Sequence, residues 1–220
     1  MTAISCLFKL FIVAVSIFLI HSWIKNKQYL IDEDELHSLA RRHIITDKHL
    51  DAETSMKLIL NDLRERYDGH ILSDEYLQWV FINCGGWMGS INVIHASLTE
   101  YILFFGSAVY TTGHSGRYLV NVSDTLLSGA MTQWKEGTLT NHTFVAGDTV
   151  KHVWGDATSV TFHGGTWMLE YGRGFIPSTL TFGLADTIFS THDVLTLFYI
   201  LRVYTYAIIQ ETTFYLSHLF

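Results

Sequence analysis

A glutamate stands in the middle of an apolar segment in the last quarter of the chain. Glu170 follows Trp167, Met168 and Leu169 and precedes Tyr171, a composition typical of a buried or half-buried β-strand. An ionised carboxylate in such a strand is costly unless it is paired, protonated or held ready for a cation. Glu170 is therefore either an ordinary residue on a solvated strand face or the anion of a binding site.

Strand alternation predicts which side chains could join Glu170. Successive side chains of a strand point to opposite faces, so residues two apart can share an interior. The side chains grouped in this way are Met168 with Glu170, Val122 with Asp124, and Tyr101 with Leu103 and Phe105. Two carboxyls in one apolar pocket cannot both ionise easily, so one keeps a proton. The remaining negative charge would pair with an ammonium group or with a carbocation formed during catalysis.

Other candidate sites are weaker. Five histidines fall in the same central region, without a His-x-His pair and following Glu that would favour a metal site in a jelly roll: His95, His114, His142, His152 and His163. Structural histidines explain them better. Cys84 has no evident partner base, and Ser115 lies in a Gly-rich segment that reads as a tight turn. We therefore expect no metal and no cofactor.

The composition indicates contact with lipid or an apolar ligand. The 220 residues contain 14 basic and 21 acidic side chains, and no basic patch indicates nucleic-acid binding. Charged residues make up 16%, against about 25% in typical soluble domains, whereas hydrophobic residues make up 49%. This excess of apolar side chains predicts a membrane partner, a large apolar cavity or both.

An apolar run near the N-terminus predicts a membrane anchor. Residues 10–20 are almost wholly apolar, and with their flanks they reach about 20 residues, the length that spans a bilayer. Lys9 can extend to the headgroups, and Trp23 suits the membrane interface. The alternative is a cleaved signal peptide, disfavoured because no small-x-small site follows the run.

The orientation of this anchor stays open. Lys25 and Lys27 follow the run and favour a cytoplasmic body. Asn121 and Asn141 begin glycosylation sequons, which matter only if the body is lumenal.

The residue pattern of the remaining chain changes twice. Residues 32–67 predict two amphipathic helices, and short apolar stretches between Gly-rich turns then predict a sandwich, jelly roll or barrel. After Pro177 the pattern is helical, with a capping box expected at 190–193. This end is either a second spanning helix or a helical pair lying on the membrane. We favour the pair, because Arg202 interrupts the run and Gln210 with Glu211 closes it.

Several motifs in one order resemble the sigma-1 receptor family, which also contains the fungal sterol delta-8/delta-7 isomerases. They are Gln78–Asn83, Gly85–Gly89, His95–Tyr101, Gly113–Tyr118, Ser123–Thr125, Trp167–Leu180 and Ala185–Thr191. The resemblance covers essentially the whole chain. It departs from the familiar vertebrate pattern at Met131, Phe162, Gly183 and Cys84, which bears on ligand preference.

The resemblance implies a mainly β fold with flanking helices in four parts. These are an N-terminal transmembrane helix and flank (1–27), amphipathic helices (28–75), a cupin-like β-barrel that binds ligand (76–175) and two C-terminal membrane-apposed helices (176–220). It further implies a homotrimer in the endoplasmic reticulum membrane, with the nuclear envelope as a further location. Its partners would be a hydrophobic amine or steroid ligand, other membrane proteins and ion channels.

The resemblance also assigns a ligand site. Glu170 falls at the position that pairs with the ligand amine, and Asp124 at the one that hydrogen-bonds that glutamate. The other implied pocket positions are Trp87, Tyr101, Leu103, Phe105, Val122, Phe162, Ile176, Thr179, Leu180 and Tyr204. The leading hypothesis is a non-enzymatic, chaperone-like receptor. The alternatives are a sterol double-bond isomerase that uses the same carboxyl pair, and a membrane adaptor with a vestigial pocket.

Overall fold

The computed structural model describes residues 3–44 and 51–217, which form two compact units divided after Leu30. The first unit contains helix α1 (Ala3–Asn26). Its stretch Ser5–Asn26 has a mean hydropathy of 2.1 and is long and apolar enough to cross a membrane. At a rise of 1.5 Å per residue, a helix of this length matches a hydrocarbon core of about 30 Å.

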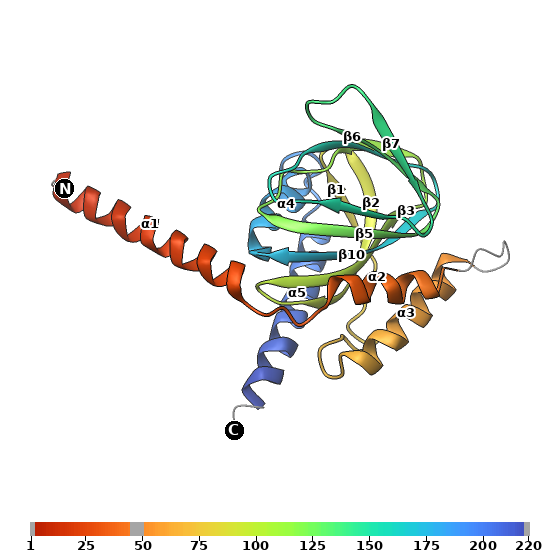
Figure 1. Cartoon of the computed structure of the whole chain (residues 1–220), viewed down its shortest axis with the longest axis horizontal. Coiled ribbons are helices and arrows are strands. Elements are labelled where there is room, and N and C mark those ends of the chain that lie inside the picture. Colours follow the sequence, from red (N-terminus) through yellow and green to blue (C-terminus); the bar gives the residue numbers. More distant parts are fainter. Residues whose placement is uncertain (1–2, 45–50, 218–220) are drawn as a thin grey trace. The chain divides into compact units, whose positions relative to one another are not determined.

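The second unit is built on two antiparallel sheets (Figure 1). The first has the strand order β1 (Val80–Cys84), β2 (Trp87–Ala96), β3 (Glu100–Ser107), β10 (Thr166–Gly174), β5 (Val120–Ser128) and β8 (Thr149–His152). The second has the order β4 (Thr111–His114), β9 (Thr158–Phe162), β6 (Ala130–Lys135) and β7 (Asn141–Val145). The predicted mainly β fold with flanking helices is confirmed.

The two sheets pack face to face around an aromatic core. Trp87 and Phe105 of the six-stranded sheet meet Phe162 of the four-stranded sheet edge to face, with ring centroids 5.7 and 5.1 Å apart. Backbone hydrogen bonds outside the strand ladders also link the sheets, such as the 2.9 Å bond from His114 N of β4 to Gly85 O in the turn between β1 and β2. Among the described residues the strands form two packed sheets that do not close into one hydrogen-bonded barrel, an arrangement that fits the predicted cupin-like fold.

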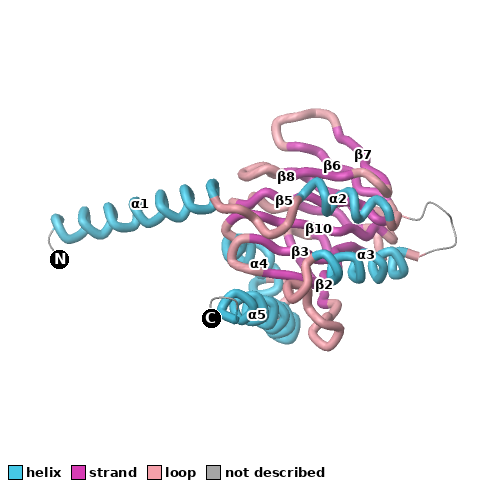
Figure 2. The backbone as a smooth tube through the Cα atoms, turned by 60° about the horizontal axis from the view of Figure 1, so that its bottom comes forward, coloured by secondary structure: helices cyan, strands magenta, loops and turns pink. Residues whose placement is uncertain are grey.

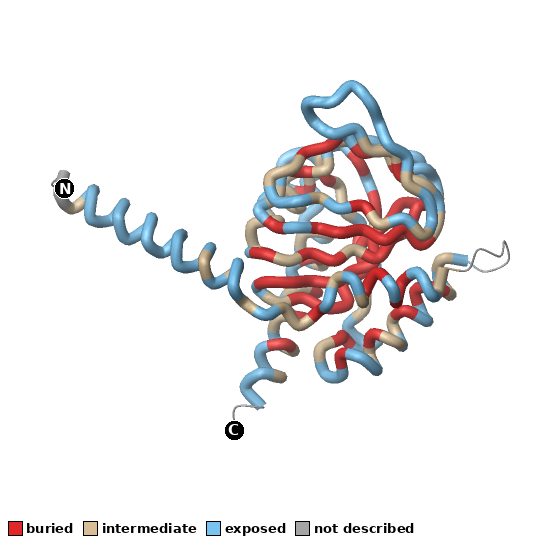
Figure 3. Tube along the Cα trace, viewed as in Figure 1, coloured by how far each residue is buried: buried red, intermediate tan, exposed pale blue. Residues whose placement is uncertain are grey.

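Two helices cover the outer face of the six-stranded sheet (Figure 2). They are α2 (Glu33–Arg42) and α3 (Ala52–Arg66), capped at their first turns by Asp32 and Asp51. Both helices lie within residues 28–75, the segment predicted to form amphipathic helices. Because helices lie on one face and the core on the other, both faces of β10 are buried (Figure 3). This explains the continuous apolar run around Glu170.

The chain after β10 forms a short 3₁₀ turn η1 (Ile176–Thr179), α4 (Leu180–Phe189) and α5 (Val194–Ser217). Asp193 caps α5 by accepting a 3.0 Å hydrogen bond from Thr196 N, in place of the predicted box beginning at Ser190. Gln210 and Glu211, which were predicted to close the apolar run, lie inside α5. The helix continues to Ser217, and Glu211 is buried with its Oε2 2.8 Å from His70 Nδ1.

Helices α4 and α5 expose many large apolar side chains. Among the described residues α1 is the one helix long and apolar enough to cross a membrane. The exposed set comprises Ile188, Phe189, Val194, Leu195, Phe198, Leu201, Tyr206, Ile209, Tyr215 and Leu216. An apolar surface of this kind fits a helical pair that lies against a membrane.

Candidate functional site

The sheet register brings the two carboxyls together. Glu170 lies at the centre of β10, directly opposite Leu103 of β3 on one side and Asp124 of β5 on the other. Directly opposed residues of antiparallel strands place their side chains on the same face, about 4.5–5.5 Å apart at Cβ. The predicted common face is therefore the inner face of the six-stranded sheet.

Tyr101 makes a hydrogen bond to one of the two carboxyls, that of Glu170. Its hydroxyl donates a 2.6 Å hydrogen bond to Glu170 Oε1. The ring reaches the carboxyl by lying across Gly172, which pairs with Tyr101 on the neighbouring strand. A Cβ at Gly172 would stand 2.2 Å from Tyr101 Cε1, so only glycine leaves room for the ring.

A histidine that sequence reasoning classed as structural stands beside Asp124. His152 of β8 places Nε2 3.5 Å from Asp124 Oδ2, and the amide of Gln133 lies within 3.4 Å of the same ring. Asp124 is 5% exposed, and its Oδ1 is buried without a hydrogen-bond partner among the described atoms. This oxygen can accept a hydrogen bond from the neighbouring carboxyl or from a ligand.

These groups line a cavity of about 110 Å³ enclosed by the sheets, η1, α4 and α5. Eleven of the twelve predicted site residues line it: Trp87, Tyr101, Leu103, Phe105, Val122, Asp124, Phe162, Glu170, Thr179, Leu180 and Tyr204. Ile176 is buried in the surrounding core instead. Residues that the sequence prediction missed are Ile82, Cys84, Ile91, Ser115, Tyr118, Met131, His152, Val160, Gly183, Leu184 and Ile200.

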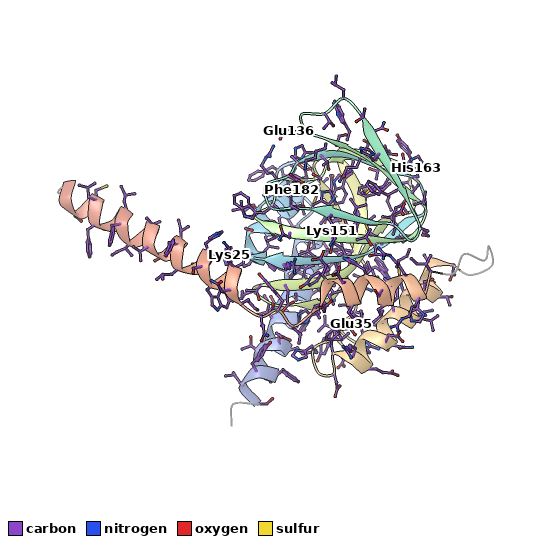
Figure 4. All side chains as sticks on the ribbon, in the orientation of Figure 1. Lys25, Glu35, Glu136, Lys151, His163 and Phe182 are labelled. Carbon is purple, nitrogen blue, oxygen red and sulfur yellow. The ribbon has the colours of Figure 1, made fainter. Side chains whose placement is uncertain are left out.

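Helix α4 adds an aromatic outer layer to this wall. Phe182 (Figure 4) packs edge to face on the cavity-lining ring of Tyr118, with ring centroids 5.6 Å apart. Alternation along a strand could not locate Tyr118 or Phe182, because they come from a loop and a helix whose faces depend on tertiary packing.

The surroundings of Glu170 favour its neutral form. Burial of the carboxyl is the largest effect and the negative charge of Asp124 the second, and together they raise the pKa of Glu170 to about 8. The hydrogen bond from Tyr101 lowers this pKa but is the smaller effect. Part of its surface stays accessible because the side chain faces the cavity. At neutral pH the empty site therefore holds a proton on Glu170 that a cation can displace.

This pKa predicts a pH-dependent stability. Because Glu170 binds its proton more tightly in the folded chain (about 8) than at its ordinary value of 4.5, its contribution to stability is complete below pH 4.5 and is lost as pH rises towards 8. We expect the free energy of unfolding of the ligand-free protein to fall with a slope approaching ~1.4 kcal/mol per pH unit. Thermal unfolding between pH 5 and 8 measures it. Subtracting the profile of Glu170→Gln isolates this carboxyl, and identical profiles would contradict the assignment.

Neither a metal nor a thiol nucleophile fits this site. No group of three His, Cys, Asp or Glu side chains able to hold a metal occurs in 3–44 and 51–217. Burial raises the pKa of the Cys84 thiol to about 12, and its sulfur lies 3.4 Å from Gly183 O. The site itself offers a carboxyl with a raised pKa beside a second carboxyl in an apolar cavity.

Comparison with known proteins identifies the family of this chain. A family model described as "ERG2 and Sigma1 receptor like protein" matches residues 7–215. The chain belongs to this family. Members of the ERG2 and Sigma1 receptor like family that resemble it include the sigma non-opioid intracellular receptor 1 of Taricha granulosa, 53% identical over 94% of this chain and 92% of that protein. The protein of the same name from Danio rerio is 51% identical over 99% and 98%.

The family also contains an enzyme. A C-8 sterol isomerase of Neurospora crassa is 36% identical over 77% of this chain and 66% of the isomerase. Among solved structures, a predicted oxalate decarboxylase of Thermotoga maritima aligns with 47% of this chain and 96% of its own, at a TM-score of 0.40 and 14% identity. An RmlC-like cupin of Shewanella frigidimarina aligns with 48% and 91%, at a TM-score of 0.40 and 11% identity.

Proposed function

We propose that the protein is a membrane-anchored receptor that binds hydrophobic cationic amines and sterol-like ligands in this cavity. The observation that carries the proposal is a carboxyl buried in an aromatic chamber whose described lining contains no Lys or Arg. A ligand ammonium would supply the missing cation and make a charge-assisted hydrogen bond to Glu170. The rings of Trp87, Phe105 and Phe162 would accommodate its apolar substituents.

The relatives named as intracellular receptors support this function at high identity. By the same resemblance, the protein would reside in the endoplasmic reticulum membrane as a homotrimer. There it would act as a chaperone-like modulator of other membrane proteins and ion channels. The apolar helix α1 and the exposed apolar faces of α4 and α5 supply two separate membrane contacts.

The charge requirement can be tested with matched ligands. A hydrophobic tertiary amine and its isosteric carbon analogue would be titrated into the purified protein at pH 8, where much of Glu170 can ionise. We expect the amine to bind at least about 100-fold more tightly, which corresponds to ~2.7 kcal/mol. Equal affinities for the two ligands would contradict the proposal, and no saturable binding of either would favour an adaptor with a vestigial pocket.

A second function, sterol double-bond isomerisation, is favoured by the neutral state of Glu170. A protonated carboxyl could donate its proton to a sterol alkene, and loss of a neighbouring C–H proton to the resulting carboxylate would complete the shift and restore the acid. Asp124 would stabilise the carbocation between the two steps. The sterol isomerase relative supports this reading.

Complementation separates the two functions. If the receptor proposal is complete, expression of this protein in a yeast strain lacking C-8 sterol isomerase should leave the sterol composition unchanged. Restored isomerised sterols in the wild type, lost again in Glu170→Gln, would instead show that the cavity is catalytic. Amounts of protein in the membrane fraction provide the control.

A further inference from the structure

The buried face of α5 contains one ionisable residue. Its buried positions are Ile200, Val203, Ala207 and Glu211, which follow one helix face at helical spacing. Ile200, together with the half-buried Tyr204, lines the ligand cavity. An apolar residue would be expected at position 211 of this stripe, yet a glutamate stands there with only 5% of its surface exposed.

Glu211 is held by two histidines, the half-buried His70 and the buried His95. Its Oε2 lies 2.8 Å from His70 Nδ1 and 3.8 Å from His95 Nδ1. His95 Nδ1 donates a 2.9 Å hydrogen bond to the carbonyl of His70, and its Nε2 is buried without a hydrogen-bond partner. His95 comes from β2 and His70 from the segment between α3 and β1, so the carboxylate joins α5 to both.

Other contacts of α5 converge on the same segment, Gly69–Ile71. Gln210 Nε2 donates hydrogen bonds of 3.0 and 3.1 Å to the carbonyls of Gly69 and Ile71. The ring of Phe214 stacks on His70 with centroids 4.0 Å apart. A Cβ at Gly69, whose φ is +79°, would stand 2.5 Å from Phe214. The segment is therefore shaped to receive this part of the helix.

We propose that Glu211 and His70 are positioning residues for the ligand cavity. Their 2.8 Å hydrogen bond fixes α5 against Gly69–Ile71 and so holds Ile200 and Tyr204 in place as the cavity wall. The inference rests on the proposed ligand-binding function. The cavity volume of about 110 Å³ is below the ~300–1,000 Å³ of typical ligand sites, so this wall must move when a ligand enters or leaves. The strength of the anchor would then set the rate of ligand exchange.

Hydrogen exchange and ligand dissociation test this anchor independently. In ligand-free Glu211→Ala, we expect the amides of residues 200–211 to exchange at least about 10-fold faster while those of β3 and β10 keep their rates. A bound tertiary amine should dissociate about 10-fold faster. His70→Ala should act similarly, and the double variant should add little to either single variant because both remove one interaction.

Two further variants make the result decisive. Thr212→Ala changes an exposed neighbour on the same helix and should leave both rates unchanged. Glu211→Gln keeps a hydrogen-bonding group and should rescue part of the effect, which also provides a folded protein if the alanine variant fails to fold. Unchanged exchange in α5, or equal acceleration in α5 and the sheets, would overturn the proposal. If no amine binds to any variant, the ligand-binding function fails while the exchange data still test the anchor.

Discussion

Replacing Glu170 by glutamine is expected to abolish high-affinity binding of a hydrophobic tertiary amine while leaving the protein folded. The amide keeps the size of the carboxyl and a partner for Tyr101, but it carries no charge. Truncating one partner of a buried, hydrogen-bonded charge pair costs ~2–5 kcal/mol, so affinity should fall by at least about 30-fold. Equilibrium titration of the purified variant measures this, with thermal unfolding as the check on folding.

Asp124→Asn is the matched comparison for this result. Asparagine at the position opposite Glu170 can still donate to its carboxylate, so the variant should lose less affinity than Glu170→Gln. An equal or greater loss would mean that Asp124 carries the charge itself. A loss of less than about tenfold in Glu170→Gln, ~1.4 kcal/mol, would show that Glu170 is not the central anion.

Gly172→Ala is expected to damage the site through Tyr101 alone. The new Cβ would stand 2.2 and 2.4 Å from Tyr101 Cε1 and Cζ, so the ring must leave its place and its bond to Glu170 must break. Overpacking of this kind costs ~1–3 kcal/mol, whereas Gly to Ala inside an ordinary strand gains ~0.5–1 kcal/mol. We expect a lower melting temperature and amine affinity reduced at least about tenfold.

Two variants locate the cause of that loss. Tyr101→Phe removes only the hydroxyl that donates to Glu170, so its smaller loss of affinity would measure the hydrogen bond without the steric clash. Gly183→Ala adds a methyl group to a cavity-lining residue of α4 where no atom lies within 4 Å, so it serves as a control for stability alone, which should be unchanged or improved. Full amine affinity in Gly172→Ala would contradict the placement of the Tyr101 ring.

Part of the site could be predicted from the sequence because the alternation of side chains along a strand depends only on local backbone geometry. Glu170 in its apolar strand, and Tyr101, Leu103 and Phe105 on one face of another, follow from a two-residue period that no tertiary contact alters. The helices after Pro177 and the apolar N-terminal run were likewise readable, since hydrophobic length and spacing determine them. The resemblance to a family supplied the pairing of Glu170 with Asp124, which alternation alone left conditional.

Features that depend on contacts between distant helices and strands became visible only in the tertiary structure. The sequence alone established an apolar strand with a costly carboxylate, a membrane-length helix and a mainly β body. It could not show that His152 stands beside Asp124, because β8 and β5 become neighbours only through sheet pairing. Nor could it show that Glu211 is buried, because the partners of a charged side chain lie 141 and 116 residues away, at His70 and His95. Burial and side-chain pairing are properties of assembled surfaces, and these surfaces exist only in the folded chain.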